Sequence, residues 1–380
     1  MSYKCEIIAD SLSPQGNRLT SFVVTYPRII HAEMCRHRIL SRNTASSRAI
    51  PFKKMVKDVQ ENPFIPIAWQ KAHKGMQGNE YFKDRHEVES RKSIWLSARN
   101  KAVEHSKFLN GKSYDLGTYK EPKKEVKSEK GVTKQLCNRL LEPFMWTTEI
   151  ISGTEWENFF KLRCPQYVVS GYPDGCSPEA LEPYEATFRS KKDAIEWLPE
   201  LEIFTDQDWL ECNESQAEIH IQKIAELMWD AYNKSTPKQL KDGEWHIPFG
   251  DNIDTKELAK TCKKLKIPVL KWKDGEQIKA WVATARCARI SYQTLGANPK
   301  IDYEADIKLH DRLLAEGHMS PFEHCARAMT EYEFNSHHRG IFVPYGDDDK
   351  DEVGMALDSN SFGWCGNFRG FIQYRHMVES

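Results

Sequence analysis

The sequence predicts an α/β fold with a mixed sheet and long helices. A strand is indicated by TSFVVTY at residues 20–26, which is rich in β-branched and aromatic side chains. Helices are indicated at residues 215–232, 275–292 and 302–317, where apolar residues recur at helical spacing. A chain of 380 residues with 40% hydrophobic and 29% charged content can bury one large core or two ordinary ones.

A first helix is expected directly after this strand, in YPRIIHAEMCRHRIL at residues 26–40. Pro27 stands where the first turn of a helix tolerates proline. One stripe of this helix would contain Ile29, Glu33, Arg36 and Leu40. The following residues, 41–48, are small and polar, so we expect the helix to run into a loop there.

Further along the chain, residues 138–164 again have helical apolar spacing, which ends at Arg163. Residues 164–213 are rich in proline, glycine and acidic residues, which indicates an insertion. The next helix opens with Ser215 and Glu218 at the spacing of a capping box. Its buried face is predicted to contain Ile221, Ile224, Ala225 and Met228. Gly317 should end the helix at residues 302–317.

The charge balance and the lack of targeting signals indicate which class of protein to expect. Lysine and arginine number 54 against 55 aspartates and glutamates, so no overall field attracts nucleic acid or a membrane surface. Residues 120–134 are rich in lysine and are most simply a solvated loop, with nucleic-acid binding as the alternative. No signal peptide and no long apolar run is present, so we expect a cytoplasmic protein.

The ten cysteines have no regular spacing, as expected for a reduced protein without disulfides. Cys164 and Cys176 bracket a short segment, but no second pair completes a tetrahedral zinc site, so no metal is expected. No cysteine has a neighbouring base or a glycine-flanked turn, so we expect no thiolate nucleophile.

The most distinctive stretch is CRHRILSRNTASSR at residues 35–48, which concentrates hydrogen-bond donors. Short hydroxyl and amide side chains combined with guanidinium groups suit phosphate binding. Arg139 and Arg163 lie in apolar segments further along, where a buried arginine needs an anionic partner. Together they predict a site for several phosphates, although the chain has no glycine-rich phosphate-binding motif.

This stretch resembles the signature of the flavin-dependent thymidylate synthases (ThyX). Four further segments are similar to motifs of that family: NRLLEP, WENFFKLR, CARISY and HMSPFEH. The last two come first in the usual family order, whereas here they come last. The resemblance covers about half of the chain and implies an enlarged, circularly permuted, phage-like ThyX-type fold.

The resemblance implies one permuted catalytic domain over residues 1–380. Its parts would be the motif-bearing segment 1–163, the insertion 164–213, the core helix 214–236, a linker 237–273, and a segment 274–380 that matches the usual family N-terminus.

The resemblance also implies an activity: transfer of a one-carbon unit from methylenetetrahydrofolate to C5 of dUMP, giving dTMP, with FAD and NADPH and in a homotetramer. The residues implied to hold FAD are Arg36, His37, Arg38, Ser41, Asn43, Asn158, His318 and Ser320. Those implied to bind the nucleotide are Glu33, Arg36, Ser46, Ser47, Arg48, Arg139 and Arg163. Arg163 is the implied catalytic residue, stabilising the pyrimidine when N3 loses its proton.

Some positions depart from the family pattern. Thr44, Ser47 and Ala49 replace the usual Glu, Gly and Tyr, and Gln216 replaces a flavin-contacting His. Glu33 replaces a nucleotide-contacting Gln, and a carboxylate suits the amino group of cytosine better than uracil. A dCMP methylase or hydroxymethylase is therefore the alternative function, and a non-enzymatic nucleotide or nucleic-acid binding module is the remote one.

Overall fold

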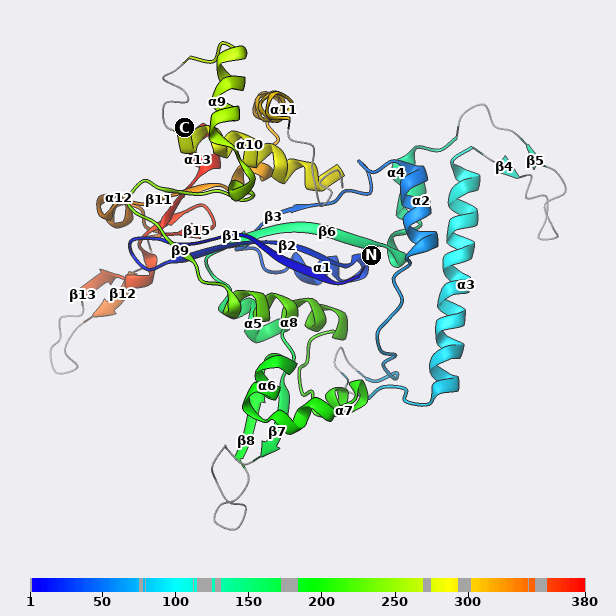
Figure 1. Cartoon of the computed structure of the whole chain (residues 1–380). Helices are drawn as coiled ribbons and strands as arrows, with labels where there is room; N and C mark the ends of the chain where they lie inside the picture. Colours follow the sequence, from blue (N-terminus) through cyan, green and yellow to red (C-terminus); the bar gives the residue numbers. More distant parts are fainter. Residues whose placement is uncertain are drawn as a thin grey trace.

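The computed structural model describes residues 2–74, 78, 80–111, 113–114, 125–126, 131–171, 184–268, 275–292, 302–340, 342–345 and 354–379. Its centre is a five-stranded sheet in the order β3-β6-β2-β1-β9 (Figure 1). The strands are β1 (Lys4–Leu12), β2 (Arg18–Pro27), β3 (Ser41–Thr44), β6 (Trp146–Gly153) and β9 (Lys238–Gln239). Since β9 is parallel to β1 and the other pairs are antiparallel, the predicted mixed sheet is confirmed.

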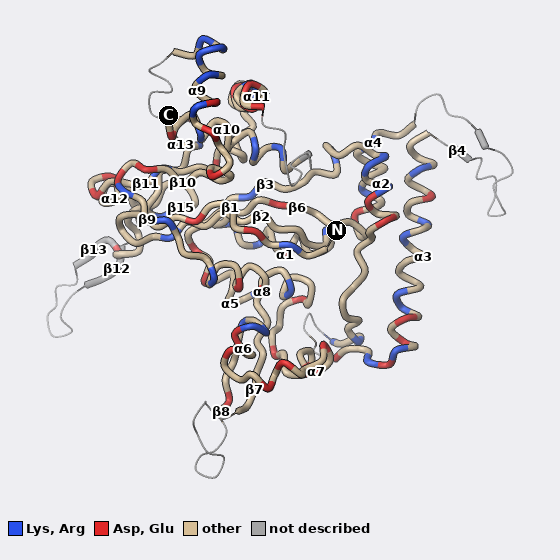
Figure 2. The backbone as a smooth tube through the Cα atoms, in the orientation of Figure 1, with Lys and Arg blue, Asp and Glu red and all other residues tan. Residues whose placement is uncertain are grey.

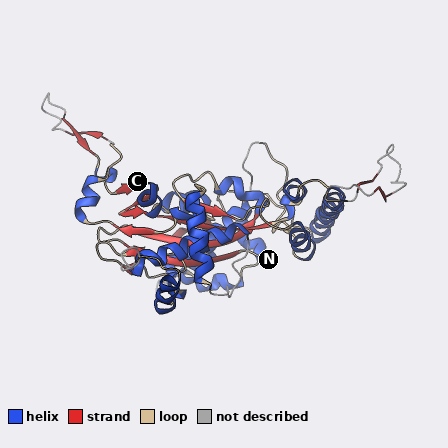
Figure 3. Cartoon of the chain, turned by 90° about the horizontal axis from the view of Figure 1, so that it is seen from above, coloured by secondary structure: helices blue, strands red, loops and turns tan. Residues whose placement is uncertain are grey.

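Helices cover both faces of this sheet, as Figures 1 and 3 show. The helices are α1 (His31–Met34), α2 (Phe52–Glu61), α3 (Arg85–Leu109), α4 (Lys134–Arg139), α5 (Glu157–Arg163), α6 (Lys191–Trp197), α7 (Asp206–Glu211), α8 (Ile219–Lys234), α9 (Thr255–Lys264), α10 (Gly275–Arg289), α11 (Tyr303–Ala315), α12 (Glu331–Ser336) and α13 (Tyr374–Glu379). None of the helices in the described residues is both long and apolar enough to cross a membrane.

The remaining strands form small sheets away from the central one. They are β4 (Ser113–Tyr114) with β5 (Glu125–Val126), β7 (Tyr167–Gly171) with β8 (Tyr184–Phe188), β10 (Trp245–His246) with β11 (Ala326–Ala328) and β16 (Phe371–Gln373), β12 (Phe342–Tyr345) with β13 (Gly354–Leu357), and β14 (Trp364–Cys365) with β15 (Phe368–Arg369).

Helix α8 packs against β1 and β2 and provides much of the main core. The predicted inner face is confirmed, because Ile221, Ile224, Ala225 and Met228 are all 0% exposed. The predicted capping box is wrong. Glu218 itself is the N-cap, and its carboxylate accepts from the backbone N–H groups of His220 and Ile221, so Ser215 lies outside the helix.

The first predicted helix is much shorter than expected. Only a 3-10 turn at Arg28–Ile30 and the four residues of α1 are helical. The predicted loop at 41–48 begins instead with β3, which pairs antiparallel with β6. That partner strand lies in the stretch 138–164, where helical spacing was expected. Pairing between distant segments overrides local spacing here.

The predicted linker at 237–273 is largely structured and belongs to the core. It contains β9, β10 and α9, and it buries Trp245, Leu258 and Cys262. These elements are held by contacts with distant segments, since β9 pairs with β1 and β10 pairs with β11. This segment is polar and its strands are only two residues long, so the sequence has no periodic pattern from which these elements could be predicted.

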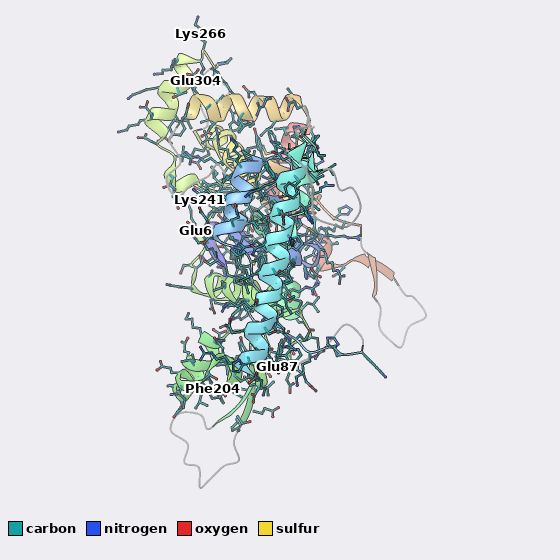
Figure 4. The ribbon with its side chains drawn as sticks, turned by 90° about the vertical axis from the view of Figure 1, so that its right-hand side faces the viewer. Glu6, Glu87, Phe204, Lys241, Lys266 and Glu304 are labelled. Atoms are coloured by element: carbon teal, nitrogen blue, oxygen red, sulfur yellow. The ribbon has the colours of Figure 1, made fainter. Side chains whose placement is uncertain are left out.

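The described part of the insertion at 164–213 has a small core of its own, formed by Tyr167, Val169, Ala194, Leu201 and Trp209. It lies beyond α8 in Figure 1, next to the start of α3. Figure 4 shows the first turn of α3, marked by Glu87, at the same end of the molecule as Phe204 of the insertion. An ion pair between Lys83 and Glu211 joins the two regions. Cys176 lies outside the described residues.

Charges of both signs are spread along the described chain (Figure 2), and α3 in particular alternates basic and acidic residues. This distribution agrees with the near-zero net charge of the sequence. Of the lysine-rich stretch 120–134, the structure describes only residues 125–126 and 131–134, so the expectation of a solvated loop lies mostly outside it.

A chain of buried hydroxyl and imidazole groups links three strands of the central sheet, β1, β2 and β6, to β10 and to His324. Ser11 Oγ is 2.9 Å from His246 Nδ1, and His246 Nε2 is 2.8 Å from Ser21 Oγ. Ser21 and Ser152 bond to each other, and Ser152 Oγ is 2.9 Å from His324 Nδ1. Burial lowers the pKa of both His246 and His324 to about 3, so both rings are neutral in the folded protein.

These two imidazoles make stability depend on pH. In the unfolded chain they titrate near a pKa of about 6.5, so below that pH the unfolded state binds protons that the folded state does not. Stability should therefore fall as the pH decreases from about 6.5 towards 3, by about 1.4 kcal/mol per pH unit for each ring. Urea unfolding at pH 7, 6 and 5 measures this slope.

The matched variants are His246→Gln with His324→Gln, and His105→Gln on the exposed surface of α3. The double variant should lose about 2.8 kcal/mol per pH unit of the slope between pH 6.5 and 5, the share of these two rings, whereas the surface variant should keep the full slope. The slope that remains comes from other groups, among them His31 and His37, whose pKa values are also lowered to about 4. An unchanged slope in the double variant would assign the acid sensitivity to other groups.

Candidate functional site

The Arg-His-Arg motif lies at a cavity of about 510 Å³. The turn after α1 contributes Arg36, His37 and Arg38 to its wall, and α5 contributes Asn158 and Arg163. Five of the residues predicted from the sequence are thus brought together, although they come from segments more than one hundred residues apart. The volume is in the range of about 300–1,000 Å³ typical of small-molecule sites.

His37 is the buried centre of this group. Arg163 donates from Nε to His37 Nε2 over 2.9 Å, and the ring of Phe159 lies edge-on at 5.0 Å. Burial and the nearby charges of Arg163 and Arg42 lower the pKa of His37 to about 4. His37 is therefore neutral and acts as an acceptor that orients the Arg163 guanidinium.

The arginines at the cavity differ from other arginines of the described chain in their pairing with acids. Elsewhere arginines pair closely, as Arg18 does with Asp10 at 2.7 Å and Arg289 with Asp306 at 2.6 Å. Within the described residues no ion pair joins Arg36, Arg38 or Arg163 to a carboxylate. Among the described lining residues the one acid is Glu155. The cavity therefore has an excess of positive charge that suits an anionic ligand.

The strand β3 follows this turn and carries Ser41 and Asn43, both buried. Asn43 donates from Nδ2 to the carbonyl of Cys287 at 2.6 Å, and its Oδ1 accepts from Ser291 and Ser320 at 3.2 and 3.4 Å. Gln373 donates to Ser41 Oγ over 3.0 Å. Residues of the CARISY and HMSPFEH segments thus contact the first motif through Asn43. The hydrogen bonds of Ser41 and Asn43 are made to other groups of the protein.

Three of the other predicted nucleotide residues lie at the far end of β3 from the Arg-His-Arg turn. Ser46, Ser47 and Arg48 form the turn after the strand, and Asn138 at the end of α4 donates to the carbonyl of Ser47 over 2.7 Å. The four residues of β3 span about 13 Å at about 3.3 Å per residue, so these residues do not share the cavity in this chain. His318 does not line the cavity either, and its Nε2 atom lies 3.4 Å from Oε2 of Glu316.

Arg48 and Arg139 are both exposed. For Arg139 this corrects the expectation of an arginine inside an apolar helix, because α4 is only six residues long and turns that side chain to solvent. Within the described residues neither guanidinium is paired with a carboxylate. The two residues therefore present unpaired positive charge on the surface of the chain.

Glu33 lies close enough to Arg163 to raise the pKa of that guanidinium, although burial and Arg36 lower it more strongly. Its Oε2 atom is buried and has no hydrogen-bond partner in the described part of the chain. An unpartnered buried carboxylate oxygen is costly and suits a ligand donor.

One cysteine does have a neighbouring base, contrary to the expectation from sequence. Cys35 Sγ is 3.5 Å from His31 Nε2, and His31 Nδ1 is 2.8 Å from the hydroxyl of Tyr26, which donates to the buried Glu149. The four-residue spacing of His31 and Cys35 on one helical turn was the available signal.

This contact does not activate the thiol. Burial, followed by the charges of Arg28 and Arg42, lowers the pKa of His31 to about 4, which makes it a weak base. Burial and Glu149 raise the pKa of Cys35, so the thiol stays protonated at neutral pH. No group of three or more possible metal ligands occurs among the described residues.

Six residues of the cavity wall were not predicted from the sequence, among them Glu155 and Trp364. Trp364 lies in the β14–β15 hairpin of the C-terminal segment, which none of the five motifs covers. Glu155 lies two residues before the start of α5, and a single carboxylate there forms no sequence pattern that predicts a site.

No family model and no curated protein matches this chain in sequence. Among solved structures, two of the UMP/dUMP methylase PolB from Streptomyces cacaoi are similar to it. The one bound with 5-Br UMP has 14% identity and a TM-score of 0.37 and covers 61% of this chain and 89% of that chain. The one bound with 5-Br dUMP has 13% identity and a TM-score of 0.36 and covers 61% and 91%. A likeness of this size does not assign the chain to a family.

The unpaired arginines predict that the cavity binds a simple anion. Arg36→Gln should weaken the binding of inorganic pyrophosphate about tenfold or more, because a charge-assisted hydrogen bond contributes roughly 1.5–3 kcal/mol. Isothermal titration calorimetry at low and high salt measures this, and the affinity should fall as salt rises.

The control is Arg91→Gln on α3, where the guanidinium already pairs with Glu87. It should bind pyrophosphate as the wild type does. Absence of pyrophosphate binding to the wild-type protein, or equal loss in both variants, would contradict an anion site at Arg36.

Proposed function

We propose that this protein transfers a one-carbon unit from methylenetetrahydrofolate to C5 of a deoxypyrimidine monophosphate, with dUMP as the substrate and dTMP as the product. The observation that carries the proposal is the cavity lined by Arg36, Arg38 and Arg163 around the neutral His37, where the described residues form no ion pair with these arginines. The resemblance of the motifs to the flavin-dependent thymidylate synthases supplies the reaction.

The residues at the cavity are compatible with FAD. Arg36 and Arg38 would hold its phosphates, Asn158 offers an amide, and Phe159 and Trp364 provide aromatic walls. The chemistry that FAD and NADPH would supply is the hydride that reduces the transferred methylene group to a methyl group. Ser41, Asn43, Ser320 and His318 remain predicted flavin contacts, and the first three of these bond to protein groups within the single chain.

Arg163 would stabilise negative charge on the pyrimidine ring. Its guanidinium is half-buried and fixed through Nε by His37, so the remaining N–H groups can donate to a ligand oxygen or ring nitrogen. A fixed positive charge in a partly desolvated site favours loss of the N3 proton and raises the electron density at C5. This role needs no thiolate, which agrees with the protonated state of Cys35.

A homotetramer would explain why the predicted nucleotide residues are divided between two places. Arg48 and Arg139 are exposed and unpaired, and the turn at Ser46 and Ser47 lies about 13 Å from the Arg-His-Arg turn along β3. We propose that a neighbouring subunit brings these residues to the cavity of another, as in the family that the motifs resemble.

The reaction is tested by purifying the protein, recording its flavin absorbance and identifying the nucleotide product by mass spectrometry. The wild type should bind FAD and convert dUMP to dTMP in the presence of NADPH and methylenetetrahydrofolate. Arg163→Lys should keep nucleotide binding but lose turnover on the order of 10²-fold, because lysine keeps the charge and loses the planar fork that His37 orients.

Arg189→Lys is the control for that variant, since Arg189 pairs with Glu157 on the surface and lies outside the cavity. It should keep full turnover. A protein that binds the nucleotide but forms no product would instead support a binding module without catalysis.

The unpartnered Oε2 of Glu33 favours a second candidate, in which dCMP is the substrate and the product is methylated or hydroxymethylated at C5. An ionised carboxylate can accept from the amino group of cytosine, whereas uracil offers an acceptor oxygen at the same position. Glu33 stands beside Arg163, which we place at the pyrimidine ring.

Competition between dUMP and dCMP decides between the two substrates. If Glu33 reads the base, the wild type should prefer dCMP, and Glu33→Gln should shift the preference towards dUMP by about tenfold, the effect of one hydrogen bond to a charged group. Glu61→Gln on the exposed end of α2 serves as the control. The same preference for dUMP in all three proteins would exclude the dCMP candidate.

A further inference from the structure

Trp364 is a part of the cavity wall that none of the five sequence motifs covers. It belongs to the β14–β15 hairpin near the C-terminus, about 200 residues after Arg163. Its side chain is half-buried and lines the same cavity as Arg36, His37 and Arg38.

The hairpin holds the Trp364 ring in a fixed place. Trp364 donates from Nε1 to the carbonyl of Asn360 over 2.8 Å. Arg369, which pairs with Trp364 across the hairpin, donates from its side chain to the carbonyl of Phe362 over 3.1 Å. The backbone N–H of Arg369 donates to Thr154 Oγ1 over 3.1 Å. Thr154 directly precedes Glu155, which lines the cavity.

Two glycines allow the hairpin to adopt this shape. Gly363 and Gly366 have φ angles of +78° and +58°, which residues other than glycine rarely adopt. A Cβ at Gly363 would also collide with the ring of Phe334. The position of the indole relative to α5 is therefore set before any ligand binds, so little conformational entropy would be lost on stacking.

One face of the indole is already stacked. The guanidinium carbon of Arg339 lies 3.4 Å from the centre of the Trp364 ring. This arrangement adds positive charge beside the cavity, and a guanidinium on one face leaves the rest of the ring surface available to a second planar group.

The cavity thus combines two kinds of wall. The first is formed by the guanidinium groups of Arg36, Arg38 and Arg163, which have no ion pair with a carboxylate in the described residues, and the second by the aromatic side chains of Phe159 and Trp364. A free phosphate would use only the first wall, and an uncharged ring only the second. A molecule that uses both has a phosphate group and a planar aromatic ring within one ligand.

We propose that Trp364 is the stacking platform for the aromatic ring of a phosphorylated ligand whose phosphate is held by Arg36 and Arg38. The inference rests on the proposed function for the identity of that ligand, since the ring could be that of FAD or the pyrimidine of dUMP. Both share the same chemistry, and separate titrations distinguish them.

The test compares ring-bearing ligands with an anion that lacks a ring. Wild type, Trp364→Leu and Trp364→Phe are titrated with FAD, AMP, dUMP and inorganic pyrophosphate, by flavin fluorescence for FAD and by calorimetry for the others. Trp364→Leu should weaken at least one ring-bearing ligand on the order of tenfold, as expected for the loss of one stacked ring. Its affinity for pyrophosphate should stay unchanged, and Trp364→Phe should recover most of the lost affinity.

The ligand that loses affinity identifies the ring. A loss confined to FAD and AMP places a part of the flavin nucleotide on Trp364, and brighter fluorescence of FAD bound to Trp364→Leu would identify the isoalloxazine itself. A loss confined to dUMP places the pyrimidine there. Trp229→Leu is the matched control, because Trp229 also lies beneath a guanidinium, that of Arg189, but outside the cavity.

Several results would overturn the platform. One is equal loss for pyrophosphate and for the ring-bearing ligands in Trp364→Leu, which would make Trp364 a structural support. Unchanged affinity for every ligand, or no binding of any ring-bearing ligand to the wild type, would also overturn it. If FAD and dUMP bind normally to Trp364→Leu and are turned over, the proposed function stands without the platform. If only AMP binds and depends on Trp364, the platform stands and the proposed function fails.

Discussion

The side-chain amide of Asn43 joins parts of the chain that lie far apart in the sequence. It bonds to the carbonyl of Cys287 and to the hydroxyl groups of Ser291 and Ser320, all within about 3.4 Å. Asn43 is buried on β3, so these bonds are shielded from water and leaving any of them unmade would be costly. The strand that carries the Arg-His-Arg turn is thereby fixed to the C-terminal half of the chain, and the cavity depends on that attachment.

The charge distribution of the cavity follows from this arrangement. The turn that contains His37 leads into β3 and lies beside α5, so Arg163 of α5 can donate to the His37 ring. Burial keeps the His37 imidazole neutral. A protonated His37 would repel the guanidinium groups around it, whereas the neutral ring accepts from Arg163 and leaves the other arginine donors free. Arg18, Arg289 and Arg327 pair with carboxylates, whereas no ion pair is present at Arg36, Arg38 or Arg163 in the described residues, so the cavity lining suits an anionic ligand.

One cluster of polar residues shows that proximity alone does not make a side chain reactive. Cys35, His31, Tyr26 and Glu149 form a connected series of contacts beside the motif, yet the low pKa of His31 and the raised pKa of Cys35 keep the thiol protonated. The series is therefore a polar network that runs from the buried Glu149 and Tyr26 to the exposed Cys35 and connects the turn between β2 and β3 to the sheet. Proximity of a thiol and an imidazole is not sufficient for a nucleophile, since the pKa values of both groups must also match.

The sequence by itself determined the strong local patterns: the strand at β2, the inner face of α8, the end of α11 at Gly317, and the donor-rich motif with Arg163 as its distant partner. These depend on periodicity and residue type within one short segment. Only the tertiary structure decided the short α1, the strands β3 and β6, the order within 237–273, and the position of Trp364 at the cavity. Each of these is set by contacts with residues a hundred or more positions away or by burial, and neither leaves a periodic signal in the local sequence.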